Sequence, residues 1–134
     1  MFTILDAGRA VEVPARIDGG RVRVPPDAVR DALGWELTPE GLCNDLTCVP
    51  VPPESTLESA DGLDLAKLAA ILDRPCAIDL DEGAAYLGVP ARDRADALRS
   101  LDAPDFTLPD LDGRLHTLSA QRGRKVLLVA YASW

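Results

Sequence analysis

The chain has little of what nucleic-acid binding, membrane insertion or histidine-based catalysis requires. Its 134 residues carry 14 lysines and arginines against 22 aspartates and glutamates, a net charge of −8. Proteins that follow a phosphate backbone need clustered positive charge instead. No apolar run approaches the ~20 residues of a membrane-spanning helix, and His116 is the single histidine. We therefore expect no nucleic-acid partner, no membrane partner and no catalytic serine–histidine–aspartate arrangement.

A signal peptide and a glycine-rich phosphate loop are also lacking. The apolar residues 2–5 are followed at once by Asp6 and Arg9, which leaves neither a basic segment nor a sustained apolar stretch for secretion. A cytoplasmic location is the expectation, and there cysteines stay reduced unless they have a redox role. Without a phosphate loop or another cofactor motif, we expect no cofactor.

Residues 1–100 predict an α+β N-terminal domain whose type the residues do not identify. Most of the negative charge lies there, since acids outnumber bases by 19 to 10 before Pro104 and bases outnumber acids by 4 to 3 after it. A glycine turn within residues 16–24 predicts a hairpin. The other expected strands are residues 2–5, 10–14, 77–79 and 84–87, and the expected helices are residues 26–33 and 64–72. Residues 89–101 predict a polar connector with partial helical character.

Two of the three cysteines, Cys43 and Cys48, lie five residues apart across an Asn-Asp turn. If residues 36–42 and 47–51 pair as a hairpin, their side chains approach within disulfide range. Two interpretations remain open: the cysteines form a redox pair that exchanges electrons, or they are two reduced, half-buried thiols. A metal site is the weaker alternative, because distant Cys76 and His116 complete a poor ligand set, so we predict no metal. Cys76 itself is expected to begin a buried strand as a small apolar side chain.

The last part of the chain carries motifs in a fixed order. Residues 103–114 are APDFTLPDLDGR, Leu-Ser follows at 118–119 and Arg-Gly at 122–123, and residues 125–134 are KVLLVAYASW. This order resembles the opening of a redoxin domain, the thioredoxin-like fold of the alkyl hydroperoxide reductase and thiol-specific antioxidant proteins. The resemblance covers roughly the last 30 residues. Residues 101–134 are thus expected to be the first β-hairpin and central strand of an incomplete thioredoxin-like α/β domain.

The resemblance also implies the site. It places the nucleophile directly after Trp134, flanked by Ser133 and Trp134, so that no catalytic residue lies in the chain itself. Ser119 is expected to cap a short turn, and His116 to lie on the surface of the hairpin. A thiol donor and a peroxide or disulfide substrate would be the partners, with the oligomeric state open. The alternative function is an accessory or binding module that has a redoxin-like tail without catalysis.

The apolar run of residues 126–130 has no alternation, as is typical of a strand covered on both faces. Such a strand needs neighbours that the sequence does not supply. We therefore expect the chain to be a fragment of a longer protein. The fragment itself is expected to be inactive. A UGA codon for selenocysteine, misread as a stop, is one explanation. A sequencing boundary and a deliberately shortened chain are the others.

Overall fold

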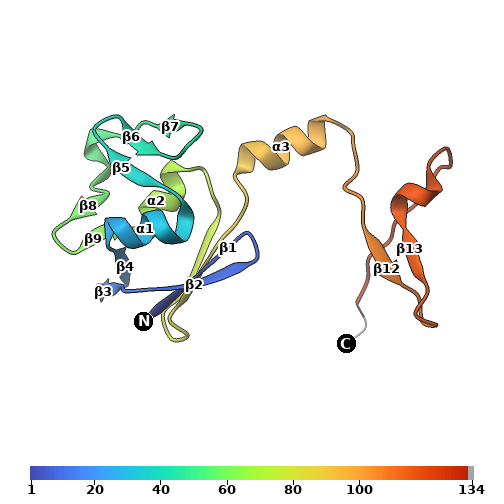
Figure 1. The fold of residues 1–134 in the computed structure, drawn as a ribbon, viewed down its shortest axis with the longest axis horizontal. Helices are drawn as coiled ribbons and strands as arrows, with labels where there is room; N and C mark the ends of the chain where they lie inside the picture. Colours follow the sequence, from blue (N-terminus) through green and yellow to red (C-terminus); the bar gives the residue numbers. More distant parts are fainter. Residues whose placement is uncertain (133–134) are drawn as a thin grey trace. The chain divides into compact units, whose positions relative to one another are not determined.

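The computed structural model describes residues 1–132, and its architecture is mixed α+β. The chain forms two compact units, Met1–Asp96 and Ala97–Trp134, which are called unit 1 and unit 2 below. Three α-helices and several small sheets make up the described part of the chain (Figure 1). None of the helices in residues 1–132 has the length and apolar character needed to cross a membrane.

The first sheet of unit 1 has its N-terminal strand in the interior. Its strands in spatial order are β10 (Cys76–Asp79), β11 (Ala84–Leu87), β1 (Phe2–Asp6) and β2 (Arg9–Val13). β1 runs antiparallel to β2 and parallel to β11, with Thr3 opposite Ala84. Phe2 and Ile4 point into the core from β1, as the alternation of a half-buried strand predicts. All four expected strands are confirmed.

The second sheet contains the hairpin that the glycines predict. Its order is β3 (Arg16–Asp18), β4 (Arg21–Val24), β9 (Gly62–Asp64) and β8 (Glu58–Ser59). Gly19 and Gly20 form the β3–β4 turn with φ values of +54° and +79°, which glycine adopts at little cost. Val22 and Val24 are buried on the core face of β4.

Both expected helices of unit 1 are confirmed. Helix α1 (Pro26–Leu33) ends at Gly34, whose backbone N–H donates to the carbonyl of Arg30 in a left-handed cap. Asp64 is the N-cap of helix α2 (Leu65–Ile71), and its carboxylate accepts a hydrogen bond from the backbone N–H of Lys67. The predicted apolar face of α2 is buried; it comprises Leu65, Leu68, Ala69 and Leu72.

One partly buried ion pair ties the first sheet to the chain after α2. The guanidinium of Arg74 contacts the carboxylate of Asp6 at the end of β1. It also donates to the carbonyls of Leu87, at 3.0 Å, and Gly88, at 2.7 Å. Side-chain exposure is 11% for Arg74 and 19% for Asp6. Arg74 therefore joins the ends of the parallel pair β1 and β11.

The third sheet of unit 1 differs from the sequence prediction. Residues 36–42 do not form one strand; they fold into β5 (Glu36–Thr38) and β6 (Gly41–Cys43), and β6 also pairs with β7 (Cys48–Val49). Pro39 has no backbone N–H for a ladder, and Gly41 has a φ of +132°. These two residues break the expected strand into a tight turn.

Unit 2 consists of a hairpin and a short 3-10 helix. Helix α3 (Ala91–Arg99), which has no buried residue, forms the connector. The hairpin pairs β12 (Thr107–Pro109) with β13 (Leu115–Thr117), and the 3-10 helix η2 (Leu118–Gln121) follows. Asp110 holds the predicted hairpin turn by accepting hydrogen bonds from the N–H groups of Asp112 and Arg114.

The expected central strand over residues 126–132 is absent from the described structure. Residues 125–132 form no regular element, and Val126, Leu127, Leu128, Val129 and Tyr131 are exposed. No described strand offers its backbone to this segment, and a strand needs a ladder partner. In addition, none of the described residues of unit 2 is buried.

Candidate redox site

The third sheet has one apolar face and one polar face. Leu37, Leu42 and Val49 occupy matching positions on its three strands and pack on the core of unit 1. Since side chains alternate along a strand, the neighbouring row points away from that core. This row consists of Glu36, Cys43 and Cys48. The alternation therefore puts both sulfur atoms of the pair on the polar face.

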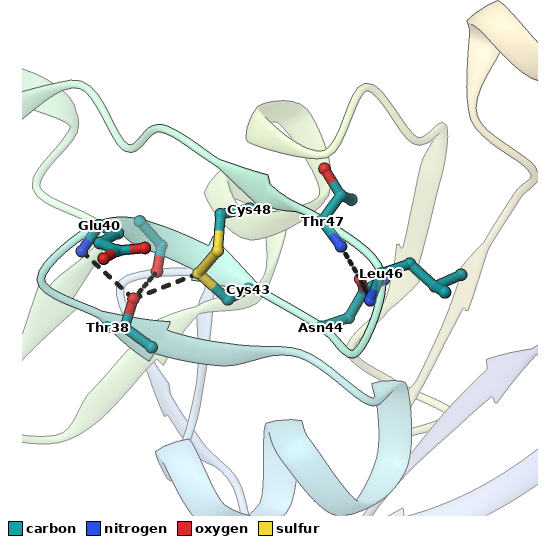
Figure 2. Close-up of a disulfide and its surroundings, with 8 residues drawn as sticks. Thr38, Glu40, Cys43, Asn44, Leu46, Thr47 and Cys48 are labelled. Atoms are coloured by element: carbon teal, nitrogen blue, oxygen red, sulfur yellow. Dashed lines mark hydrogen bonds between the residues drawn. A yellow bond between two sulfur atoms is a disulfide. The ribbon is translucent and has the colours of Figure 1, made fainter.

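Cys43 and Cys48 form a disulfide (Figure 2), with Cα atoms 4.0 Å apart. The Asn44 side chain builds the turn between them, because its carbonyl oxygen accepts hydrogen bonds from the N–H groups of Leu46, at 2.9 Å, and Thr47, at 2.8 Å. The backbone N–H of Asn44 also donates to the carbonyl of Thr47. The structure thus has the pair in its disulfide-bonded form.

The disulfide is accessible from solvent. Cys48 is exposed and Cys43 is half-buried. Thiol–disulfide exchange begins when a thiolate reaches one of the two sulfurs, and exposure of Cys48 favours this step. Thr38 lies on the other side, with its hydroxyl 3.2 Å from the Cys43 sulfur. The same hydroxyl oxygen accepts a hydrogen bond from the N–H of Glu40 (Figure 2).

Gly41 keeps β6 and β7 close together. A Cβ atom at this position would lie 2.2 Å from the carbonyl oxygen of Val49. We expect Gly41→Ala to destabilise unit 1 by at least about 1 kcal/mol, because it adds a backbone clash to an unfavourable φ. Chemical denaturation would measure the loss. Gly8→Ala is the control, since Gly8 has a φ of +80° but open space around it. Equal losses of stability in the two variants would show that the close approach of Gly41 to the Val49 carbonyl is unimportant.

Cys76 lies away from this pair, at the start of β10 in a different sheet. It begins its strand as predicted, but it is half-buried and not fully buried. Burial raises the pKa of the Cys76 thiol, and the positive charge of Arg74 partly offsets this effect. The thiolate fraction of Cys76 at neutral pH is therefore lower than that of an ordinary cysteine.

We expect Cys76 to be the slowest of the three cysteines to react with iodoacetamide after the disulfide is reduced. A thiol with a raised pKa supplies less of the reactive thiolate, so its rate should keep rising with pH beyond the ordinary cysteine range. Mass spectrometry of peptides from timed samples would measure each rate. The difference should disappear in denaturant, and equal rates in the folded protein would contradict the expectation.

In unit 2, Asp105 anchors the segment that the redoxin resemblance singled out. The expected cap at Ser119 is wrong: Thr117 is the N-cap residue of η2, and the N–H of Ser119 donates to the Asp105 carboxylate at 2.8 Å. Hydrogen bonds from Ser119, first from its side chain and then from its backbone, lower the pKa of Asp105. This contact therefore contributes to folding stability at pH values above the ordinary aspartate pKa. Its contribution is lost as the pH falls through the lowered pKa.

The remaining predicted residues of unit 2 lie as follows. His116 is exposed on β13, as expected, with Nε2 2.8 Å from a carboxylate oxygen of Asp110. This hydrogen bond is the main cause that lowers the pKa of Asp110. Ser133 and Trp134, the predicted flank of the nucleophile, lie outside the described residues.

A shallow apolar groove of about 430 Å³ lies between Phe106, Leu108 and residues 128–131.

Two residues of these sites escaped sequence reasoning. Glu40 reaches the cysteine pair because the chain turns at Pro39. Proline and glycine at positions 39 and 41 signal a turn, but they do not show which side chains the turn brings together. Asp105 is visible as the third residue of the APDF motif, but its partner Ser119 is 14 residues away.

Compared with known proteins, the chain matches no family model, no curated protein and no solved structure.

Proposed function

We propose that this chain is part of a thiol-dependent oxidoreductase of the redoxin class, which reduces peroxides or exchanges disulfides with a thiol donor. The observation that carries the proposal is the order of redoxin-like motifs in residues 103–134. Two structural features support it. The hairpin β12–β13 forms where those motifs predict one, and a hydrogen bond from the N–H of Ser119 in η2 to the carboxylate of Asp105 joins the two ends of this hairpin segment.

The proposed reaction needs a nucleophile that follows Trp134 in the full-length protein. A thiolate there attacks a peroxide oxygen, the O–O bond breaks, an alcohol or water leaves, and the sulfur becomes a sulfenic acid. A donor thiol then condenses with the sulfenic acid and releases water. At a strand-to-helix junction, the helix N-terminus lowers the pKa of such a thiol. A selenocysteine at that position would supply a selenol as the nucleophile.

The Cys43–Cys48 disulfide is proposed as an electron carrier for this reaction. A donor dithiol would transfer two electrons and two protons to it, and the donor would itself become a disulfide. The resulting dithiol of unit 1 could then reduce the oxidised nucleophile. The exposure of Cys48 supports this role, since exchange begins with attack on an accessible sulfur.

The apolar surface of unit 2 also supports a larger redoxin domain. By itself a two-stranded hairpin is marginally stable, and the described part of unit 2 buries none of its residues. Helices that pack on a thioredoxin-like sheet would cover surfaces such as the groove at Phe106 and Leu108. The proposal therefore includes further chain that covers this groove.

An accessory or binding module is the second candidate. It is favoured by the absence of a strand over residues 125–132 in the described structure, because the catalytic proposal needs that segment as a central strand. The two candidates differ in whether a nucleophile follows the apolar segment.

The genomic DNA after codon 134 distinguishes them. A cysteine codon, or an in-frame UGA followed by the rest of a thioredoxin-like domain, supports the oxidoreductase. A different stop codon at that position leaves no nucleophile and would sink the catalytic proposal in favour of the accessory module. Peroxide reduction by the full-length protein, and its loss when the nucleophile is replaced by serine or alanine, would complete the test.

A further inference from the structure

We propose that the reduced form of unit 1 binds a thiophilic divalent cation, with Zn²⁺ as the expected ion, through Cys43, Cys48 and Glu40. Closing the disulfide would release the ion. This inference goes beyond the proposed redoxin function and does not depend on a nucleophile after Trp134, because all three ligands lie in the third sheet of unit 1.

The three ligand atoms are already close together. A carboxylate oxygen of Glu40 and the two sulfur atoms lie within 4.8 Å of one another. Glu40 comes from the turn between β5 and β6, Cys43 ends β6 and Cys48 begins β7 (Figure 2). Cys76 and His116 cannot complete this site from their present positions, because both belong to other sheets. The turn at Pro39 brings in Glu40 instead.

These ligands suit zinc once the sulfur–sulfur bond is broken. Zinc binds thiolate sulfur at about 2.3 Å and carboxylate oxygen at about 2.0–2.2 Å in tetrahedral geometry, which places two ligating sulfurs about 3.8 Å apart. Cys43 and Cys48 lie directly opposite each other on paired strands. Rotation about their side-chain bonds can separate the sulfurs without a change in strand register. Water would complete a four-coordinate site with three protein ligands.

The backbone around the site is held by contacts other than the disulfide. The Asn44 side chain fixes the turn between the two cysteines. The Thr38 hydroxyl oxygen accepts the N–H of Glu40 and lies 3.2 Å from the Cys43 sulfur. The hydroxyl proton now points to the carbonyl of Gly41, 3.2 Å away. After reduction it can turn to the Cys43 thiolate instead, and such contacts orient metal ligands and raise affinity. Reduction should therefore leave the three ligands near one another.

The redox and binding steps balance as follows. A donor dithiol gives the disulfide two electrons and two protons, which yields two thiols and an oxidised donor. Binding of M²⁺ to the thiols forms two metal–sulfur bonds and releases two protons. In reverse, hydrogen peroxide takes two electrons from the bound thiolates and two protons from solvent, which yields the disulfide, two water molecules and free M²⁺.

Titration of the phosphine-reduced full chain with Co²⁺ under argon tests the site. We expect one equivalent to bind, with the thiolate-to-cobalt charge-transfer absorption of two sulfur ligands, and Zn²⁺ to displace it. The oxidised chain should bind none. Hydrogen peroxide should release one ion for each disulfide formed, which a chromophoric chelator would quantify.

Matched variants identify the ligands. Glu40→Gln should weaken Zn²⁺ binding about tenfold or more, and Cys43→Ser or Cys48→Ser should abolish the two-sulfur absorption. Glu36→Gln is the control, because Glu36 lies in the same row as Cys43 and carries the same charge outside the ligand set. Cys76→Ser should bind normally. Failure of the reduced wild type to bind, a stoichiometry of one ion per two chains, or equal losses in Glu40→Gln and Glu36→Gln would overturn the proposal.

Discussion

The 134-residue chain should reduce peroxide and exchange disulfides no faster than ordinary free thiols at the same concentration, whereas the protein read through the frame after codon 134 should catalyse one or both reactions. The reason is chemical: the proposed nucleophile follows Trp134, and the helix that would ionise it follows the nucleophile. Consumption of hydrogen peroxide with dithiothreitol as electron donor would measure the difference. Replacement of the nucleophile by serine in the longer protein should return the rate to that of the short chain.

The cysteines of unit 1 provide the control for this result. A double variant of the short chain, Cys43→Ser with Cys48→Ser, should be as inactive as the unmodified short chain. Turnover by the short chain that alkylation or this double variant abolishes would contradict the expectation. In that case the disulfide of the third sheet, and not a residue after Trp134, would carry the chemistry.

Arg74→Met should destabilise unit 1 by about 3 kcal/mol. The variant keeps the apolar stem of the side chain but leaves the carboxylate of Asp6 without its positive partner in a largely buried place. It also removes the donors to the carbonyls of Leu87 and Gly88. Breaking a buried pair costs about 3–5 kcal/mol, and the residual exposure of Asp6 places the loss at the lower end. Urea unfolding monitored by tryptophan fluorescence would measure it.

Arg16→Met is the matched control for this prediction. Arg16 pairs with Asp61 at 2.8 Å, but the two side chains are 75% and 47% exposed, and exposed pairs contribute about 0–1 kcal/mol. Adding Asp6→Asn to Arg74→Met should restore part of the lost stability, because it removes the uncompensated charge. Similar losses in Arg16→Met and Arg74→Met would show that burial of the Asp6 pair is unimportant.

Local patterns predicted most of unit 1. Glycine turns, apolar alternation and a buried helical face identify β1 to β4, α1, α2, β10 and β11, because each signal depends on neighbours within a few residues. The prediction is wrong at residues 36–42, because Pro39 and Gly41 divide this segment into two short strands and a turn. The ion pair of Asp6 with Arg74 spans 68 residues, and no local pattern indicates it.

The candidate sites were harder to predict for the same reason. The spacing of Cys43 and Cys48 allowed a disulfide but did not require one, since the register of β6 and β7 depends on the Asn44 turn. Serine is a common N-cap residue, but Ser119 lies inside η2 and its N–H donates to the carboxylate of Asp105, 14 residues earlier in the chain. The strand prediction over residues 126–132 rested on the redoxin-like motif order and on the unbroken apolar run, and neither supplies the hydrogen-bonding neighbour that a strand needs.

The interior position of β1 has a consequence for synthesis on the ribosome. β2 can pair with β1 as soon as both have emerged, but the other edge of β1 waits for β11, where Thr3 meets Ala84. Contacts this distant in sequence close slowly, and domains fold as units during translation. The nascent chain therefore holds an open β1 edge until Leu87 has left the exit tunnel, and a chaperone that shields this edge should raise the yield of folded protein.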